Sequence, residues 1–418
     1  MPLRAKTLPH SADIQALKLE IKQLSSARKA LPQDDYAGKA ALSKALKRAK
    51  KELGLLQNVA KVDDTAAAGE PQPPSPAYTG DFSISSDLTG WQDFVERVPA
   101  SHYHQLAWKD LFETIMGRET RYLTARDTTH QIVGVLPLAL TRSRLFGHYG
   151  VSLPYVNGGS AASVAGNVSK ALVEHAFGQV TEWGLSHIEV RDEQFHEDLP
   201  VRTDKVAMRL ELAGLASITD LLNLLGSKVR AQSKKAMSSG IIFHVGGTRW
   251  LDDFYSVFSR NMRDLGTPVY SKALFGAILE SFPQDASLVV GHYGQSPVSA
   301  AFLLRHGDNW EIPWASTLRK ANNIAANMAL YTRVLTEVIA HQGQQFDFGR
   351  SSIDSPTYRF KKQWQAIPHA QYWYYSDPTY SHALTTTTPK YAFAIRLWKK
   401  LPLTIANTLG PVIVRNLP

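Results

Sequence analysis

The chain has 418 residues, 44% of them hydrophobic and 20% charged, a composition typical of a folded protein with a sizeable core and, at this length, two or three domains. It contains no cysteine, which excludes disulfides, thiolate metal sites and a cysteine nucleophile. No secretory signal opens the sequence, and no apolar run approaches the ~18 residues that span a bilayer. We therefore expect a cytoplasmic protein.

The net charge of +9 is concentrated at the two ends of the chain. Residues 1–60 carry a net charge of +7 and residues 390–418 a net charge of +5, which leaves −3 for the residues between them. Basic ends suit an anionic partner, such as nucleic acid, acidic lipid or a phosphorylated carrier, although solvated faces have the same composition.

Two amphipathic helices are predicted at the start of the chain. Apolar residues recur at helical spacing over residues 14–31 and again over 42–56, and Pro32 in the intervening LPQDDYAG favours a turn. The sequence therefore predicts a basic helical hairpin within residues 1–60, followed by a Pro/Ala-rich linker over 61–80.

After the linker, one order of predicted elements occurs twice. The first copy is a helical pattern at 89–116, the strands RYLTARD and IVGVLPLAL around the turn TTHQ, the loop PYVNGGSAAS, a helix at 167–183 and the strand HIEVRD. The second copy is helices at 218–238 and 249–282, the strands SLVVGHY and VSAAFLLRH around the turn GQSP, then NWEIPWAS, the loop TLRKANNIAAN, a helix at 327–341 and the strand FDFGRS. We expect an α/β (α+β) fold made by duplication, with domains at 81–205 and 206–385 and a basic amphipathic tail at 386–418.

Several segments, in this order, resemble the FemAB-like proteins, and in particular the branch associated with exosortase and exopolysaccharide loci of Gram-negative bacteria. They are HQLAWKDLFETIMG, IVGVLPLALTRSRLFG, VSLPYVNGG, LGTPVYSKALF, AANMALYTRVL and FDFGRSSIDSPTYRFKKQW, between about Trp91 and Tyr375. The resemblance implies two tandem GNAT-like domains. It also implies transfer of an acyl or aminoacyl group onto an amine or hydroxyl of a cell-envelope or exopolysaccharide precursor.

The chain departs from that branch at three places. NMALYT keeps Asn327 and Tyr331 but lacks the usual acid and Trp, and SSIDSPTYRFKK replaces a Gly-Thr-Gly turn. LRKANNIAAN lacks the Gly-rich phosphate turn of CoA-binding acetyltransferases. We expect no bound cofactor, and the acyl donor stays open between acyl-CoA, an acyl carrier and aminoacyl-tRNA. The alternative function is a non-catalytic GNAT-like adaptor that binds a polysaccharide-assembly complex at the membrane.

Asp347, in the strand FDFGRS, is the candidate catalytic residue. Acyl transfer needs a group that takes the proton of the acceptor, and burial between Phe346 and Phe348 would raise the pKa of this carboxylate towards neutral. The alternative is an aspartate that pairs with a neighbouring arginine to fix a loop. No metal site is expected, because the 14 histidines are scattered.

The candidate substrate-binding residues belong to the second copy. Arg350 and Lys361 supply positive charge for an anionic small molecule or a lipid-linked glycan, and Gly349 allows close approach of the backbone. A salt-bridged loop is the alternative. The other residues expected to line this cleft are Tyr358, Asn327, Trp314, Ser316, Tyr270 and Arg230. The basic hairpin suits a tRNA partner.

The tail predicts one of two structures. Apolar residues recur at intervals of four, at Phe393, Leu397, Leu401 and Ile405, with basic residues between them. Pro402 favours two short helices rather than one. Such a segment lies in a bilayer interface, as a peripheral contact at the inner face of the membrane, or it docks on the second domain and hides the same residues.

Overall fold

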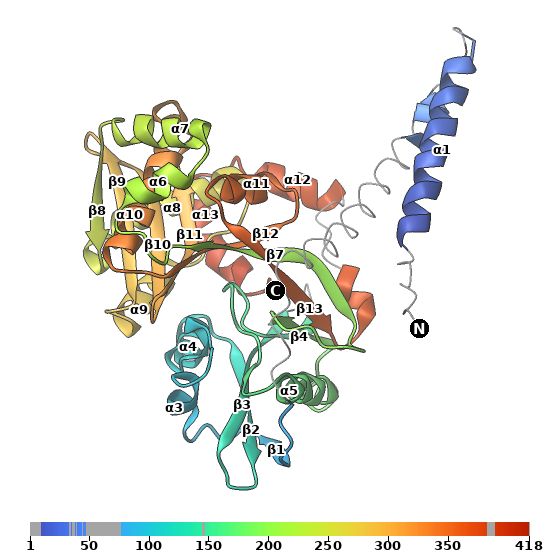
Figure 1. The fold of residues 1–418 in the computed structure, drawn as a ribbon, viewed down its shortest axis with the longest axis vertical. Coiled ribbons are helices and arrows are strands. Elements are labelled where there is room, and N and C mark those ends of the chain that lie inside the picture. Colours follow the sequence, from blue (N-terminus) through green and yellow to red (C-terminus); the bar gives the residue numbers. More distant parts are fainter. Residues whose placement is uncertain are drawn as a thin grey trace.

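The computed structural model describes residues 10–32, 35, 38, 40–43, 45, 46, 77–143, 147–382 and 389–417. Residues 61–76 of the predicted linker and most of the second hairpin helix lie outside the described residues. Helix α1 (His10–Ala30) forms as predicted, and Figure 1 shows it standing away from the sheet. Across the described ranges, no helix is both long and apolar enough to cross a membrane.

In the described part, one mixed 13-stranded sheet runs through both halves of the molecule (Figure 1). Its order is β1-β2-β3-β4-β6-β13-β7-β12-β11-β10-β9-β8, with β5 beside β3. The strands are β1 (Phe82–Ser85), β2 (Glu119–Asp127), β3 (Ile132–Ser143), β4 (Gly147–Val151), β5 (Ala162–Ser163), β6 (His187–Asp192), β7 (Val201–Glu211), β8 (Ile241–Gly246), β9 (Ala286–Tyr293), β10 (Ser296–His306), β11 (Asn309–Thr317), β12 (Gln345–Ser352) and β13 (Ile367–Tyr375).

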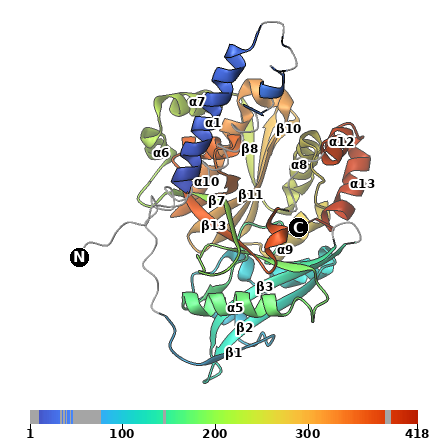
Figure 2. The ribbon, with the colours of Figure 1, turned by 90° about the vertical axis from the view of Figure 1, so that its right-hand side faces the viewer.

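Helices cover both faces of this sheet. They are α3 (Trp91–Val95), α4 (Ala107–Asp110), α5 (Gly166–Gly178), α6 (Ile218–Leu224), α7 (Ser227–Met237), α8 (Leu251–Leu265), α9 (Lys272–Ser281), α10 (Ala326–Ala340), α11 (Pro356–Gln363), α12 (Pro389–Trp398) and α13 (Leu403–Val414). Short 3-10 or π turns are η1 (His102–His104), η2 (Leu111–Ile115), η3 (Thr248–Trp250), η4 (Arg319–Ile324) and η5 (Pro378–His382). Figure 2 shows α8 and α10 on opposite sides of β10 and β11.

The predicted duplication is confirmed. The hairpin β2–β3, then β4, α5 and β6, corresponds to the hairpin β9–β10, then β11, α10 and β12. In each half the strand before the helix pairs in parallel with the strand after it. The structure adds β1, β4, β5, β7, β8 and β13, which the sequence did not predict, and it divides the long helices expected at 218–238 and 249–282. Gly226 precedes α7, and Gly266 ends α8 with φ 86°, a left-handed conformation that glycine adopts readily.

The two halves exchange a strand. Strand β7 follows β6 in sequence but pairs with β12 of the second half, and β13, which follows β12, pairs with β6 of the first half. The exchanged strands also pair with each other. Strand β7 begins at Val201 and so crosses the boundary drawn between residues 205 and 206. Each half is therefore completed by a strand of the other.

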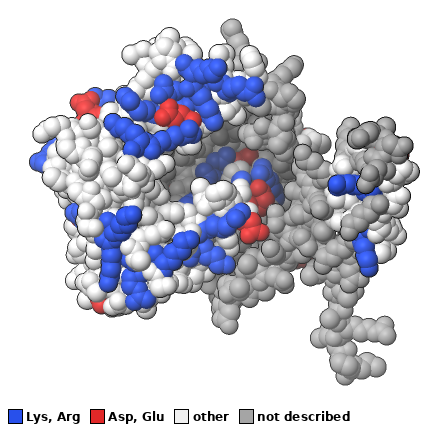
Figure 3. Space-filling view, turned by 90° about the horizontal axis from the view of Figure 1, so that it is seen from above, with Lys and Arg blue, Asp and Glu red and all other residues white. Residues whose placement is uncertain are grey.

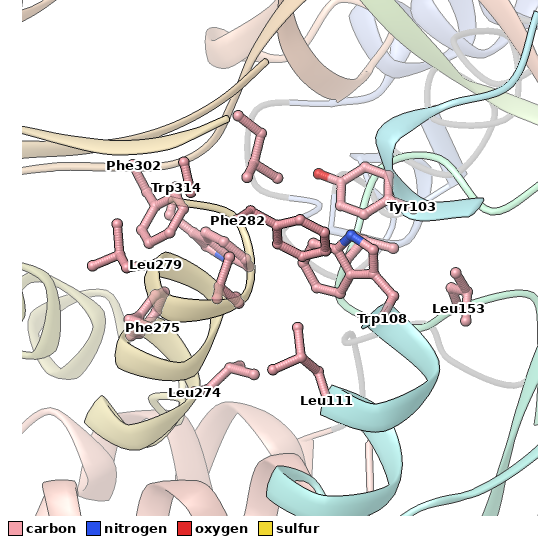
Figure 4. Packing of buried hydrophobic residues seen from close by; sticks show 14 of the residues in the cluster. Tyr103, Trp108, Leu111, Leu153, Leu274, Phe275, Leu279, Phe282, Phe302 and Trp314 are labelled. Atoms are coloured by element: carbon pink, nitrogen blue, oxygen red, sulfur yellow. The ribbon is translucent and has the colours of Figure 1, made fainter. Parts of the chain in front are cut away.

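One hydrophobic core joins the halves. Tyr103 and Trp108 of the first half lie beside Phe282 of the second half (Figure 4), and the rings of Trp108 and Phe282 stack with centroids 5.7 Å apart. The same cluster continues through α8, α9 and β10 to Trp314. This packing fixes the first half against the strands that carry the candidate site.

Candidate active site

The strands β11 and β12 separate at the candidate site. They pair in parallel over three residues only, and the last pair is Glu311 with Asp347. Beyond this point β12 bonds to β7 alone, while β11 continues beside β10. Parallel neighbours project to the same face of a sheet, so the two carboxylates lie together where the strands part.

A bulge in each strand gathers further side chains on that face. On β11, Glu311 and Trp314 oppose Leu304 and Phe302, so three steps on one strand match two on the other. On β12, Asp347 and Arg350 oppose Arg209 and Ala207 in the same way. An extra residue reverses the alternation of a strand. Asp347 and Arg350 therefore share a face, although they are three residues apart.

Glu311 accepts hydrogen bonds from two residues of the first half. The Tyr103 hydroxyl donates to Oε1 over 2.8 Å, and Asn157 Nδ2 donates to the same oxygen over 2.5 Å. Burial and the neighbouring Asp347 carboxylate raise the pKa of Glu311 to about 7, although these hydrogen bonds oppose the rise. A carboxyl group in this state exchanges a proton near neutral pH.

Asp347 is held by an arginine and by the backbone. Arg209 Nε donates to Oδ2 over 3.2 Å, and the Gly349 N–H donates to Oδ1 over 2.6 Å. Burial raises the pKa of Asp347 above its usual value, while Arg209 and the Gly349 N–H oppose that rise. The burial comes from the face opposite to Phe346 and Phe348, because those two rings belong to the core beneath α10. This corrects the cause that the sequence suggested.

Gly349 makes the bulge on β12 possible. Its φ is 78°, and a Cβ atom there would lie 2.9 Å from Asn157 Nδ2. A side chain at this position would strain the backbone and displace the amide that holds Glu311.

Arg350 lies at the junction of the two halves. Its Nη2 donates to the Val156 carbonyl over 2.9 Å and its Nε to Asn157 Oδ1 over 3.2 Å. The guanidinium lies 5.3 Å from the centre of the Trp373 ring, which also has Arg191 at 4.5 Å. Burial and the charge of Arg191 lower the pKa of Arg350 to about 10. Arg350 Nη1 and Trp373 Nε1 are buried donors with no acceptor in the described part of the chain.

Lys361 of α11 is bound to the same bulge. Its Nζ donates to the carbonyls of Gly349 and Arg350, each over 2.9 Å, and 7% of the residue is exposed. Burial lowers the pKa of Lys361 to about 8, although the Asp347 charge opposes this. The structure thus brings together Asp347, Arg350 and Lys361 among the residues that the sequence proposed.

The other proposed residues have other neighbours, although Tyr270 lies close enough to Arg350 to affect its pKa. Tyr358 is buried in the core of the second half, and Trp314 lies in the core shared by both halves. Ser316 is buried and accepts a hydrogen bond from Asn261, and Tyr270 packs edge-on to Trp314 and Tyr155. Asn327 is exposed and accepts from Thr317 over 3.3 Å, and Arg230 is half-buried on α7.

The sequence did not point to the side chains of Glu311, Tyr103, Asn157 and Trp373 as part of this site. Strict alternation along NWEIPWAS places Glu311 on the face opposite to Trp314, whereas the bulge places both on one face. The signal was Pro313, because a proline inside a paired strand usually marks an edge or a bulge. No local signal joins the other three residues to the site, since they come from distant segments.

Basic side chains also gather on one face of the molecule. Figure 3 looks down on the top of Figure 1, where α7, α11 and α12 are drawn, and it shows Lys and Arg around a hollow that holds both basic and acidic side chains. Exposed examples are Lys234 of α7 and Lys362 of α11. This face favours an anionic ligand.

Comparison with known proteins agrees with this fold. Residues 227–362 match the family model described as an acetyltransferase (GNAT) domain, and no curated protein matches the chain in sequence. FemX is similar in structure, with 12% identity and a TM-score of 0.53, over 72% of this chain and 99% of that chain. The C-terminal domain of a putative lysylphosphatidylglycerol synthetase from Agrobacterium fabrum has 10% identity and a TM-score of 0.46, over 74% and 94%. A tandem GNAT protein from the clavulanic acid biosynthesis pathway has 10% identity and a TM-score of 0.44, over 71% and 99%.

The domain match contains Glu311, Asp347, Arg350 and Lys361. The likeness to FemX concerns the fold, and it confirms the expected pair of tandem GNAT-like domains. The chain is therefore an acyltransferase built on this fold, as the sequence predicted.

Proposed function

We propose that this acyltransferase moves an acyl or aminoacyl group onto an amine or hydroxyl of a cell-envelope or exopolysaccharide precursor. One observation carries the proposal: Glu311 and Asp347 are paired where β11 and β12 part, and Lys361 binds the bulge beside them. Parted strands leave backbone N–H groups free to donate hydrogen bonds to the carbonyl oxygen of the acyl donor. The sequence resemblance to the exopolysaccharide-associated branch supports the class of acceptor.

The groups present suit direct transfer without a covalent enzyme intermediate. The acceptor attacks the donor carbonyl carbon, a C–N or C–O bond forms, and the bond to the donor sulfur or oxygen breaks. Glu311 takes the proton of the acceptor, and the departing thiolate or alkoxide takes up that proton. Lys361, still largely charged at neutral pH, stabilises the oxyanion.

Asp347 is the second carboxylate of this pair. Its oxygens already accept from Arg209 and Gly349, so we assign the proton transfer to Glu311. The negative charge of Asp347 keeps the pKa of Glu311 high, and its bonds hold the bulge that positions Arg350. If Glu311 proves dispensable, Asp347 is the alternative base.

The substrate that we propose is anionic. Arg350 Nη1 and Trp373 Nε1 lie in one cluster as buried donors, and an oxygen of a phosphate or carboxylate would satisfy both kinds of N–H. An anionic small molecule or a lipid-linked glycan carries such oxygens. We place the reaction in the cytoplasm, at the inner face of the membrane where lipid-linked precursors are available.

The donor is an acyl-CoA, an acyl carrier or an aminoacyl-tRNA. Turn η4, which leads into α10, contains no glycine, and Ala325 takes a left-handed conformation with φ 54°. This loop differs from the Gly-rich turn that binds phosphate in other proteins. The difference favours a donor that is held by other groups of the chain. The basic hairpin at residues 1–60 is the proposed contact for tRNA, so a chain without it should lose affinity for charged tRNA and keep its fold.

Transfer of a radiolabelled group tests the proposal. The full chain is incubated with acyl-CoA, acyl carrier protein or charged tRNA, each with a membrane extract that contains lipid-linked glycans. Glu311→Gln should lower the rate of transfer about 10²-fold or more, because the shape remains and the base is lost. Glu280→Gln, an exposed glutamate of α9, is the matched control and should transfer at the normal rate.

The result separates the two functions under consideration. Transfer that is lost in Glu311→Gln and kept in Glu280→Gln supports the proposal, and Arg350→Lys should then raise KM for an anionic acceptor more than it lowers kcat. No transfer from any donor, with retained binding of the glycan fraction, would favour the non-catalytic adaptor. Transfer that is unaffected by Glu311→Gln would remove this residue from the mechanism.

A further inference from the structure

Helix α13 packs against α8. Figure 2 shows α12 and α13 on the side of the sheet where α8 lies. They form as two short helices separated at Pro402, as predicted. Helix α13 docks on the second half, where Gly410 lies so close to Val269 that a Cβ atom would be 2.8 Å from the Val269 nitrogen. Docking of the tail is therefore part of the structure.

The docked helix buries one face and leaves large apolar side chains exposed on another. Ala406, Gly410 and Val414 face the protein, and Ala406 is 1% exposed. Five large apolar side chains of α12 and α13 are exposed, and we call them together the tail face: Phe393, Leu397, Ile405, Leu409 and Val412. Phe393 is 66% exposed and Val412 is 60% exposed. A helix that served only to complete the core would have the opposite arrangement.

The exposed apolar residues of each helix are spaced so that they form a stripe along one face of that helix. Phe393 and Leu397 are four residues apart on α12, and Ile405, Leu409 and Val412 follow the i, i+4, i+7 pattern of one helix face on α13. Docking and exposure therefore involve different faces of the tail, and Leu401, between the helices, belongs to neither stripe.

Contacts with both halves hold the tail face in place. Arg118 Nη2 donates to the carbonyls of Arg415 and Leu417, over 2.8 and 2.9 Å. The Tyr155 hydroxyl donates to the Val414 carbonyl over 2.7 Å, and Arg263 Nη1 donates to the Leu401 carbonyl over 3.0 Å. These hydrogen bonds hold the tail against the rest of the protein, so the exposed stripes have a fixed position.

The charge around the tail face has one sign. No Asp or Glu occurs after residue 377, and Arg396, Lys399 and Lys400 are exposed where the two helices meet. The nearby Asp264 of α8 is paired with Arg263 over 2.8 Å. Exposed apolar stripes with flanking cations and no acids complement a bilayer whose surface is anionic.

We infer that the tail face is a docking surface for an anionic lipid bilayer. Phe393, Leu397, Ile405, Leu409 and Val412 enter the interface, and Arg396, Lys399 and Lys400 contact the lipid phosphates. This inference goes beyond the transfer reaction, because it assigns a partner to a surface that contributes no residue to the candidate active site. It stands or falls independently of catalysis.

Sedimentation of the full chain with vesicles tests this inference. Vesicles of phosphatidylglycerol and phosphatidylethanolamine are compared with vesicles of phosphatidylcholine alone, at low and at 0.5 M salt. We expect the chain to bind the anionic vesicles and salt to weaken that binding. Phe393→Ser with Leu397→Ser should weaken it about tenfold or more at either salt concentration, and Lys399→Glu with Lys400→Glu should abolish its salt dependence.

Matched variants control for general effects. Leu224→Ser with Ile242→Ser removes two equally exposed apolar side chains outside the tail, and Lys235→Glu reverses an exposed charge on α7. Both control variants should bind as the unchanged chain does, and all variants should keep its melting temperature. Equal loss in tail and control variants, or no binding to anionic vesicles at low salt, would overturn the inference. A dimer in solution that dissociates in Phe393→Ser with Leu397→Ser would instead make the tail face an interface between copies.

Discussion

Glu311 is a carboxylic acid whose neighbours act on its pKa in opposite directions. Burial and Asp347 raise the pKa, whereas the hydrogen bonds from Asn157 and Tyr103 lower it. The balance leaves the proton exchangeable near neutral pH, which is the range in which a general base works best. The first half of the molecule thus tunes a residue of the second half.

The Tyr103→Phe variant tests this tuning. The variant keeps the ring in the core but removes the hydroxyl that donates to Glu311, so the carboxylate is less stabilised and its pKa should rise further. In the unchanged chain, kcat/KM should increase as the pH rises through about 7, because Glu311 loses its proton there. In Tyr103→Phe this limb of the pH profile should move to higher pH while the rate at its plateau changes less. A profile that stays in place would mean that another group controls the limb.

The same raised pKa affects stability. Between the unfolded and folded pKa values of Glu311 the folded state binds more protons, so the contribution of this residue to stability falls as the pH rises through that window. Keeping a poorly compensated carboxylate here therefore favours function over stability. Glu189 of β6, the strand that corresponds to β12, differs from Glu311 because its charge is matched by Arg191 at 2.6 Å.

At the scale of single elements, the two bulges were not predicted, and Pro313 was the one local signal for the bulge on β11. Alternating and helical patterns predicted the hairpins, the two long helices α5 and α10 and the strands after them, because each depends on local side-chain period. The bulge on β11 depends on pairing with β10, which lies on the other side of a turn, and the bulge on β12 depends on β7, more than a hundred residues away. Asp347, Arg350 and Lys361 were found because they are close in sequence, whereas their partners are not.

The docking of α13 gives a prediction at this scale. Gly410→Ala places a methyl group 2.8 Å from the backbone nitrogen of Val269 and 2.9 Å from its oxygen, and backbone atoms cannot move aside as a side chain can. We expect a lower melting temperature, by an amount that corresponds to about 1–3 kcal/mol, and faster tryptic cleavage at Lys399 and Lys400.

Gly178→Ala is the matched control for this variant. Gly178 is the last residue of α5, and a Cβ atom there meets nothing within 4 Å. Alanine is the better helix former, so this variant should melt at the same temperature or slightly higher. If the two variants melt at the same temperature, the close packing of α13 does not contribute to the stability of the protein.

At the scale of the whole molecule, duplication was visible in the sequence but the exchange of strands was not. The order of elements repeats, and this predicted two similar domains one after the other. The sequence order is the same with or without the exchange, because β7 follows β6 in both cases. Only the strand beside which β7 lies differs, and that pairing is not a local property of the sequence. The boundary between residues 205 and 206 therefore falls within an element that belongs to both halves.

The strand exchange predicts that the halves cannot be separated. A chain of residues 206–382 would begin in the middle of β7 and would leave β13 without β6, while residues 77–205 would lack the strand that covers the edge of β6. Both pieces would also expose the apolar surface between Trp108 and Phe282. We expect each piece to be insoluble alone and the two to form a folded body only when they are expressed together, with one melting transition for the intact chain in calorimetry. Two separate transitions, or a soluble second half with a cooperative melt, would show that the exchanged strands add little to the stability of each half. The contacts from Tyr103 and Asn157 to Glu311 would then be the main link between them.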